Sequence, residues 1–89
     1  DTGLSGKGVV VTGGAGGIGS AVVRAFATEG ARVVVHYHSS AAAALRLAEE
    51  VGGVAIGADL RVEQQAEELL ASAVAAVGRV DVCVANAGV

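Results

Sequence analysis

Four short, valine-rich runs alternate with longer segments in which apolar residues recur at helical spacing. The runs cover Gly8–Thr12, Arg32–Tyr37, Val54–Ala58 and Val80–Ala85. Nearly continuous β-branched residues, without regular alternation with polar ones, are typical of strands that are covered on both faces. A strand followed by a helix and then by another strand indicates a parallel sheet with right-handed crossovers. The sequence therefore predicts an α/β fold.

The three intervening segments have the pattern of amphipathic helices. On the first, the spacing predicts a buried face made of Ile18, Ala21, Val22, Ala25 and Phe26. We expect Gly30 to end this helix in a left-handed conformation. The second helix is expected to begin at Ser39 or Ser40 and to end before Gly52-Gly53. The third ends at Gly78, and its apolar side is predicted to hold Val62, Ala66, Leu69, Leu70, Ala73 and Val77.

Four strands and three helices make up half of a doubly wound, Rossmann-type sheet. In the usual strand order, 3-2-1-4, the ligand crevice opens between strands 1 and 4. The fourth strand would then be an exposed edge, which is an aggregation liability. We therefore expect residues 1–89 to be one incomplete dinucleotide-binding domain, a fragment of a longer protein. Within the fourth strand, Cys83 is predicted to be a small buried hydrophobic residue.

Charge and composition exclude several classes of function. Six basic and nine acidic residues give a net charge of -3, which is the wrong sign for a nucleic-acid phosphate-backbone binder. No apolar run approaches the roughly 18–20 residues that span a bilayer, and no signal-peptide pattern occurs, so we expect no membrane association. The single cysteine has no partner for an internal disulfide, which favours a reduced, cytoplasmic protein.

The segment after the first predicted strand carries the strongest chemical signal. It reads Thr12, Gly13, Gly14, Ala15, Gly16, Gly17, Ile18, Gly19 and opens the first predicted helix. A dinucleotide fingerprint needs this context, because glycines permit a tight turn and a close approach of the backbone to a pyrophosphate. Amides at a helix N-terminus then receive the anion. A glycine-rich connection without a ligand is the alternative, whereas a Walker-type loop is excluded because no Lys-Ser or Lys-Thr follows.

Three glycine patterns can be read from this loop. Gly14, Gly16 and Gly19 spell G-x-G-x-x-G, and Gly13, Gly16 and Gly19 spell G-x-x-G-x-x-G. The third pattern, T-G-x-x-x-G-x-G, uses Thr12, Gly13, Gly17 and Gly19, and it resembles the short-chain dehydrogenase/reductase family.

Two further motifs, in the order that this family has them, support the resemblance. Asp59-Leu60 resembles the acidic position whose carboxylate approaches the adenine amino group. Asn86-Ala87-Gly88 resembles the N-A-G motif that supports the sheet and lines the cofactor crevice. The extended, epimerase-like branch favours G-x-x-G-x-x-G, but typically has a bulky residue where Gly17 stands and lacks N-A-G. The resemblance is therefore to the ordinary branch, and it covers the whole chain.

The end of the second predicted strand indicates which nicotinamide cofactor is used. An NAD enzyme places a carboxylate there, about 20 residues after the glycines, to bind the ribose 2′-hydroxyl. Here Tyr37, His38 and Ser39 occupy that region, and residues 31–48 contain no carboxylate. A 2′-phosphate meets no repulsion and can accept hydrogen bonds from His38, Ser39 or Ser40. We expect NADP rather than NAD.

Two histidines, His36 and His38, lie two residues apart on this strand and raise the question of a metal. No cysteine or carboxylate stands nearby at ligand spacing, so we expect no metal site.

The resemblance implies chemistry that this chain does not carry alone. The family uses a Tyr general acid, a Lys four residues later and a Ser, whereas Tyr37 and Lys7 are the only Tyr and Lys here and lie on different elements. We expect those catalytic residues beyond the chain, in a homo-oligomeric parent that transfers hydride between nicotinamide and a small carbonyl or alcohol substrate. The alternatives are a non-catalytic, truncated nucleotide-binding module and a fragment of an extended-branch sugar-nucleotide epimerase.

Overall fold

The computed structural model describes residues 3–85, and its elements follow the predicted order. The strands are β1 (Gly8–Thr12), β2 (Arg32–Tyr37), β3 (Val54–Gly57) and β4 (Val82–Ala85), and the helices are α1 (Gly17–Thr28), α2 (Ala41–Val51) and α3 (Glu63–Val77). Both β1 and β2 have the predicted bounds, whereas β3 ends earlier and β4 begins later than expected. No helix within residues 3–85 combines the length and the apolar character needed to cross a membrane.

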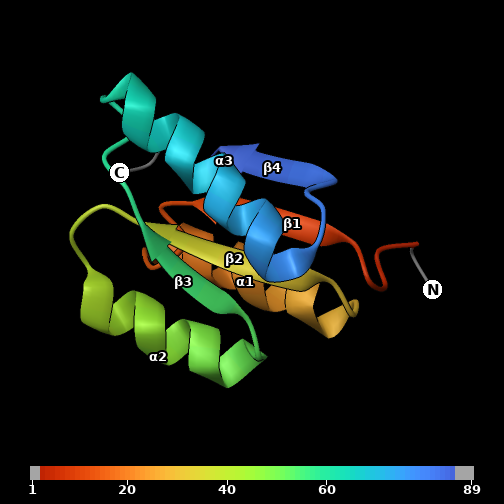
Figure 1. Ribbon diagram of the computed structural model, residues 1–89. Helices are drawn as coiled ribbons and strands as arrows, with labels where there is room; N and C mark the ends of the chain where they lie inside the picture. The colour runs from red at the N-terminus through yellow and green to blue at the C-terminus, as the bar shows by residue number, and fades with distance from the viewer. Residues whose placement is uncertain (1–2, 86–89) are drawn as a thin grey trace.

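The four strands form one parallel sheet in the order β3-β2-β1-β4, which confirms the predicted Rossmann-like topology (Figure 1). In the register of the sheet, Val9 of β1 lies opposite Val33 of β2 and Val82 of β4. All carboxyl ends therefore meet at one edge, and the loops that follow β1, β2 and β3 lie next to one another. This edge is where a doubly wound sheet binds its ligands.

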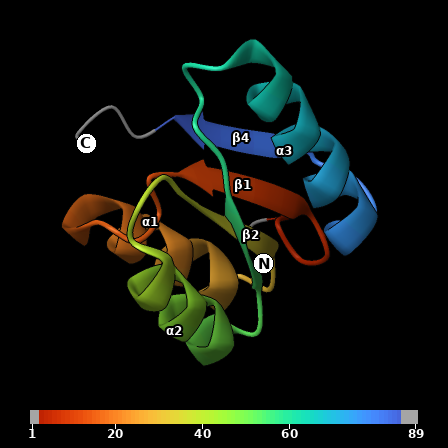
Figure 2. The same cartoon turned by 60° about the vertical axis from the view of Figure 1, so that its left-hand side comes forward.

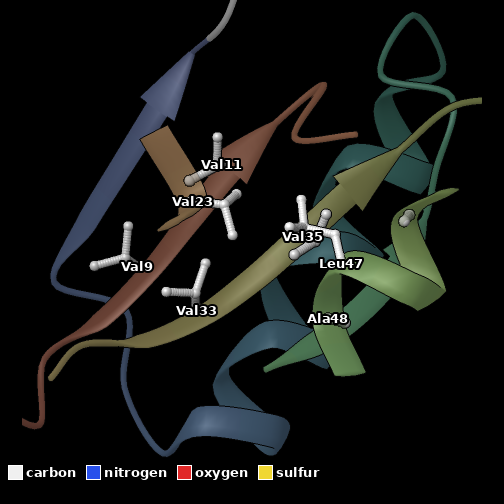
Figure 3. Close-up of a cluster of buried hydrophobic side chains, with 8 residues drawn as sticks. Val9, Val11, Val23, Val33, Val35, Leu47 and Ala48 are labelled. Atoms are coloured by element: carbon white, nitrogen blue, oxygen red, sulfur yellow. The ribbon is translucent and has the colours of Figure 1, made fainter. Parts of the chain in front are cut away.

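The sheet separates two apolar layers (Figure 2). On one face, α1 and α2 pack on alternate residues of β1 and β2, and Figure 3 shows the side chains that meet there: Val9, Val11, Val23, Val33, Val35, Leu47 and Ala48. On the other face, α3 packs over Val10 and Val34. Because side chains alternate along a strand, one valine run supplies both layers.

The buried face of α1 matches the predicted one only in part, since Val22 and Phe26 are half-buried and pack against the core. Gly19 and Val23 are buried, whereas Ile18 is 71% exposed and Ala21 and Ala25 are also exposed. Alanine buries little apolar area, so its position on a helix barely determines which face packs. Val23, which is fully buried, marks the face of α1 that packs on the sheet.

The apolar side of α3 is narrower than predicted. Its buried residues are Leu69, Ala73 and Val77, which recur every four positions, whereas Leu70 is 49% exposed and Val62 is 43% exposed. The prediction for Cys83 was also wrong, because this residue is exposed. Among the described elements α3 contacts β1, β2 and β3 but not β4, so no helix covers the thiol.

Candidate functional site

The glycine loop turns the chain sharply from β1 into α1. Gly13 has φ +63°, a left-handed conformation that glycine adopts without steric cost. The N–H of Gly16 then donates to the carbonyl of Gly13 at 3.2 Å, and the N–H of Gly14 donates to the carbonyl of His36 at 3.0 Å. These two bonds close the turn and attach it to β2.

The N-terminus of α1 presents its amides at this turn. Its first hydrogen bond runs from Ser20 N–H to the carbonyl of the N-cap residue, Gly16, at 2.7 Å. The amides of Gly17, Ile18 and Gly19 precede that bond, and the first amides of an α-helix have no intrahelical acceptor. No side chain within residues 3–85 caps this end of α1. The helix dipole and these amides together form a site suited to an anion.

Two glycines of the loop have opposite surroundings. A Cβ on Gly14 would lie 3.0 Å from Val35 Cγ1, 3.1 Å from the Val11 carbonyl oxygen and 3.3 Å from Val23 Cγ2, so this glycine serves close packing. A Cβ on Gly17 would meet nothing within 4 Å. Of the glycines in the T-G-x-x-x-G-x-G pattern, Gly13 is left-handed, Gly17 faces open space and Gly19 is buried.

A cavity of about 620 Å³ opens between this loop and the end of β2. Its walls are Gly13, Ala15, Gly16, Gly17 and Ile18 on one side and residues 36–40 on the other. The structure therefore brings the predicted pyrophosphate loop together with the predicted ribose-binding residues Tyr37, His38 and Ser39. These segments are more than ten residues apart in sequence and meet only because β1 and β2 are paired.

A second cavity, of about 440 Å³, continues the first toward β3. It is lined by Thr12, Gly13, His36, His38, Ala58, Asp59, Leu60 and Arg61. Three of these residues, Gly13, His36 and His38, line both cavities. The predicted adenine-side pair, Asp59-Leu60, thus lies next to the predicted pyrophosphate loop. The hydroxyl of Thr12 donates to the carbonyl of Val84 at 3.2 Å and joins the ends of β1 and β4.

The carboxylate of Asp59 is held by Arg61 of its own loop and lies near His38 at the end of β2. Arg61 donates to both of its oxygens, and the Nε2 atom of His38 lies 3.7 Å from Oδ2. The guanidinium of Arg61 lowers the pKa of Asp59 to about 2, with smaller effects from the Arg61 backbone N–H and from His38. The Asp59 N–H donates to Gln65 Oε1 at 2.8 Å, which anchors the loop to α3. Asp59 is thus a fixed negative charge whose field Arg61 largely cancels.

Sequence reasoning missed the contribution of His36 to this site. This residue is only 4% exposed, and it is buried between the two loops rather than directed to solvent like His38. The two histidines do not converge on a common ligand, and no group of three metal-ligating side chains occurs within residues 3–85. A polar residue inside a valine-rich run on a doubly covered strand is the sequence signal that could have identified His36. The remaining predicted residues, Asn86, Ala87 and Gly88, lie outside the described residues.

Known proteins share this architecture. The family model for short chain dehydrogenases matches residues 7–89. The chain is 48% identical over 91 residues to L-rhamnose 1-dehydrogenase (NAD(P)(+)) of Azotobacter vinelandii, an alignment that covers 93% of this chain and 36% of that protein.

Two solved structures superpose closely on the chain. One is BdcA in complex with NADPH, with a TM-score of 0.83, 38% identity, and 97% of this chain and 34% of that chain covered. The other is a short chain dehydrogenase from Burkholderia cenocepacia J2315 in complex with NADP, with a TM-score of 0.86, 34% identity, and 97% and 37% covered. The chain therefore spans about a third of the length of these proteins.

Proposed function

Because the chain belongs to the short chain dehydrogenase family, we propose that it is the NADP(H)-binding part of an oxidoreductase that acts on a small carbonyl or alcohol substrate. The observation that carries this proposal is the cavity between the glycine loop and the end of β2, which combines the exposed amides of a helix N-terminus with hydroxyl and imidazole donors. A dinucleotide phosphate needs both kinds of group.

The pyrophosphate is assigned to the start of α1. The first amides of α1, those of Gly17, Ile18 and Gly19, point toward the N-terminus of the helix, where the dipole favours negative charge. Of these residues, Gly17 and Ile18 line the cavity. Gly17 leaves open space at the position where any other residue would place a Cβ. The backbone can therefore approach a phosphate oxygen closely, as the fingerprint requires.

The preference for NADP over NAD is assigned to the end of β2. Tyr37, His38 and Ser39 line the cavity, and none of its lining residues carries a carboxylate. The nearest carboxylate to His38, that of Asp59, is paired with Arg61 and repels a 2′-phosphate only weakly. Relatives whose structures hold NADPH or NADP support this assignment.

The adenine is assigned to the second cavity, beside Asp59 and Leu60. Thr12 lines the same cavity. When bound, the cofactor supplies hydride from its nicotinamide ring or accepts it from the substrate. The groups of this chain bind and orient the cofactor, and we assign proton transfer to the rest of the longer protein.

Calorimetric titration tests the proposal, with NADPH and NADH as ligands for the protein that carries this sequence. We expect saturable binding of both, at least about tenfold tighter for NADPH. Gly17→Val should weaken both ligands by at least about tenfold, because it adds a branched side chain at a residue that lines the cavity. Ala42→Val, which places the same side chain on an exposed position of α2, is the matched control.

Each outcome has a definite meaning. Failure of the wild-type protein to bind either ligand contradicts the proposed function. Equal affinity for NADPH and NADH contradicts only the NADP preference. Unchanged affinity in Gly17→Val places the pyrophosphate elsewhere.

A further inference from the structure

His36 is a buried polar side chain at the centre of the site. It follows Val34 by two residues on β2, so it lies on the α3 side of the sheet, where the other buried residues are apolar. It is 4% exposed and yet lines both cavities. Burying an imidazole costs free energy unless both ring nitrogens find partners, so its bonds explain why it is tolerated there.

Both ring nitrogens are hydrogen-bonded, and their partners define one tautomer. The N–H of Gly13 donates to Nδ1 at 3.1 Å, so Nδ1 must carry a lone pair. The other nitrogen, Nε2, lies 2.8 Å from the carbonyl oxygen of Ala58, which only accepts, so Nε2 must carry the proton. The arrangement therefore requires the neutral Nε2–H form.

The two partners belong to different loops. Gly13 is the left-handed residue that starts the glycine loop, and Ala58 directly precedes Asp59 on the loop after β3. Backbone bonds already attach each loop to β2, from Gly14 to the carbonyl of His36 and from Ala58 to the carbonyl of Tyr37. The imidazole is the added link that reaches from one loop to the other.

We infer that His36 is a positioning residue that sets the distance between the pyrophosphate-binding loop and the adenine-side loop. The inference rests on the proposed function and deepens it, because the pyrophosphate and the adenine of one bound cofactor must fit the two loops at once. The Gly13 bond orients the pyrophosphate loop, and the Ala58 bond orients the loop that carries Asp59 and Leu60.

Two variants separate the two bonds. In His36→Asn, the amide oxygen takes the place of Nδ1 and keeps an acceptor for Gly13, but the side chain is too short for Ala58. In His36→Gln, the amide nitrogen takes the place of Nε2 and keeps a donor for Ala58, but Gly13 loses this acceptor. The probes are NADPH, which contains the pyrophosphate, and 2′-AMP, which contains only the adenosine 2′-phosphate.

The expected result is a split between the two ligands, measured with the protein that carries this sequence. His36→Asn should weaken NADPH and 2′-AMP by the same factor, about threefold to tenfold, because both ligands use the Ala58 side. His36→Gln should weaken NADPH by about threefold to tenfold and leave 2′-AMP unchanged. Two results would overturn the inference. One is an equal loss of affinity for NADPH and 2′-AMP in both variants, which would show general destabilisation. The other is an affinity within twofold of wild type for both ligands in both variants.

Nitrogen NMR of the imidazole in the wild-type protein provides a second test that needs no ligand. With ¹⁵N-labelled histidine, His36 should show an unprotonated Nδ1 and a protonated Nε2, and the signals missing from His36→Asn assign it. A protonated Nδ1, or rapid averaging between tautomers, would overturn the inference. If the wild-type protein binds neither ligand but shows the expected tautomer, the proposed function fails and the coupling of the loops stands.

Discussion

Arg61 donates to both carboxylate oxygens of Asp59, with Nε 3.0 Å from Oδ1 and Nη2 2.9 Å from Oδ2. The two residues are separated by one position, so the pair forms within a single turn between β3 and α3. A planar guanidinium that meets a carboxylate in this way fixes its orientation as well as its charge. Asp59 therefore presents a defined edge to the second cavity before any ligand arrives.

Arg61→Gln should raise the pKa of Asp59 from about 2 toward its ordinary value, because the largest stabiliser of the charged form is removed. A lowered pKa stabilises the fold above the unfolded-state pKa, and that contribution is lost as the pH falls through about 2. The variant should therefore lose stability relative to wild type at neutral pH and converge with it at acidic pH. Carboxyl ¹³C NMR measures the titration directly.

Arg46→Gln, which removes a guanidinium from an exposed position of α2, controls for the change in net charge. It should leave the titration of Asp59 in place. The account of this loop is wrong if Arg61→Gln leaves the Asp59 midpoint near 2, since the ion pair would then not be responsible for it.

Tyr37→Asp should shift the cofactor preference from NADP toward NAD. The new carboxylate lines the first cavity, where it repels a 2′-phosphate and accepts a hydrogen bond from a 2′-hydroxyl. We expect the ratio of NADPH to NADH affinity to fall by at least about tenfold. Leu45→Asp introduces the same charge on α2 outside the cavity lining and should leave the ratio unchanged. If Tyr37→Asp and wild type have the same ratio of NADPH to NADH affinity, the assignment of Tyr37 to the ribose site is wrong.

Alanine substitutions at two glycines of the same loop should have different effects on stability. Gly14→Ala places a Cβ 3.0 Å from Val35 Cγ1 and should cost about 1–3 kcal/mol, because the packed neighbours must move. Gly17→Ala meets nothing within 4 Å and should be neutral or stabilising by up to about 1 kcal/mol. Chemical denaturation measures both values, and equal costs would show that the two positions do not differ as described.

Most of the fold could be predicted from the sequence because each of the four valine-rich runs covers a whole strand. Continuous β-branched residues mark β1 and β2 without ambiguity, and the position of the glycines after β1 indicates where the ligand edge lies. The alternation of strands and helices indicates a parallel sheet, and the observed order 3-2-1-4 is the usual one for a doubly wound sheet. These features depend on local pattern and connectivity alone.

Packing directions and side-chain bridges could not be predicted in the same way. The apolar spacing along α1 fits more than one face, because several of its apolar residues are small alanines, and only contact with β1 and β2 selects the face that contains Val23. The bonds of His36 to Gly13 and Ala58 link residues 22–23 positions apart. Such bonds depend on strand pairing in three dimensions, which no local pattern encodes.

Two truncations on α1 test whether Val23, rather than Ile18, lies on its buried face. Val23→Ala should cost about 2 kcal/mol, because a wholly buried side chain is shortened in a packed layer. Ile18→Ala should change stability by less than about 0.5 kcal/mol, since Ile18 is 71% exposed. Thermal or chemical unfolding measures both changes. A larger loss of stability in Ile18→Ala than in Val23→Ala would favour the face that the sequence predicts.

The most direct test of the dinucleotide site is an amide NMR titration of the protein that carries this sequence with NADP⁺. We predict that the largest shifts occur at the amides of Gly17, Ile18 and Gly19, because a bound pyrophosphate would accept hydrogen bonds from them. Saturable binding that leaves these three signals in place, or no binding at all, would contradict the assignment.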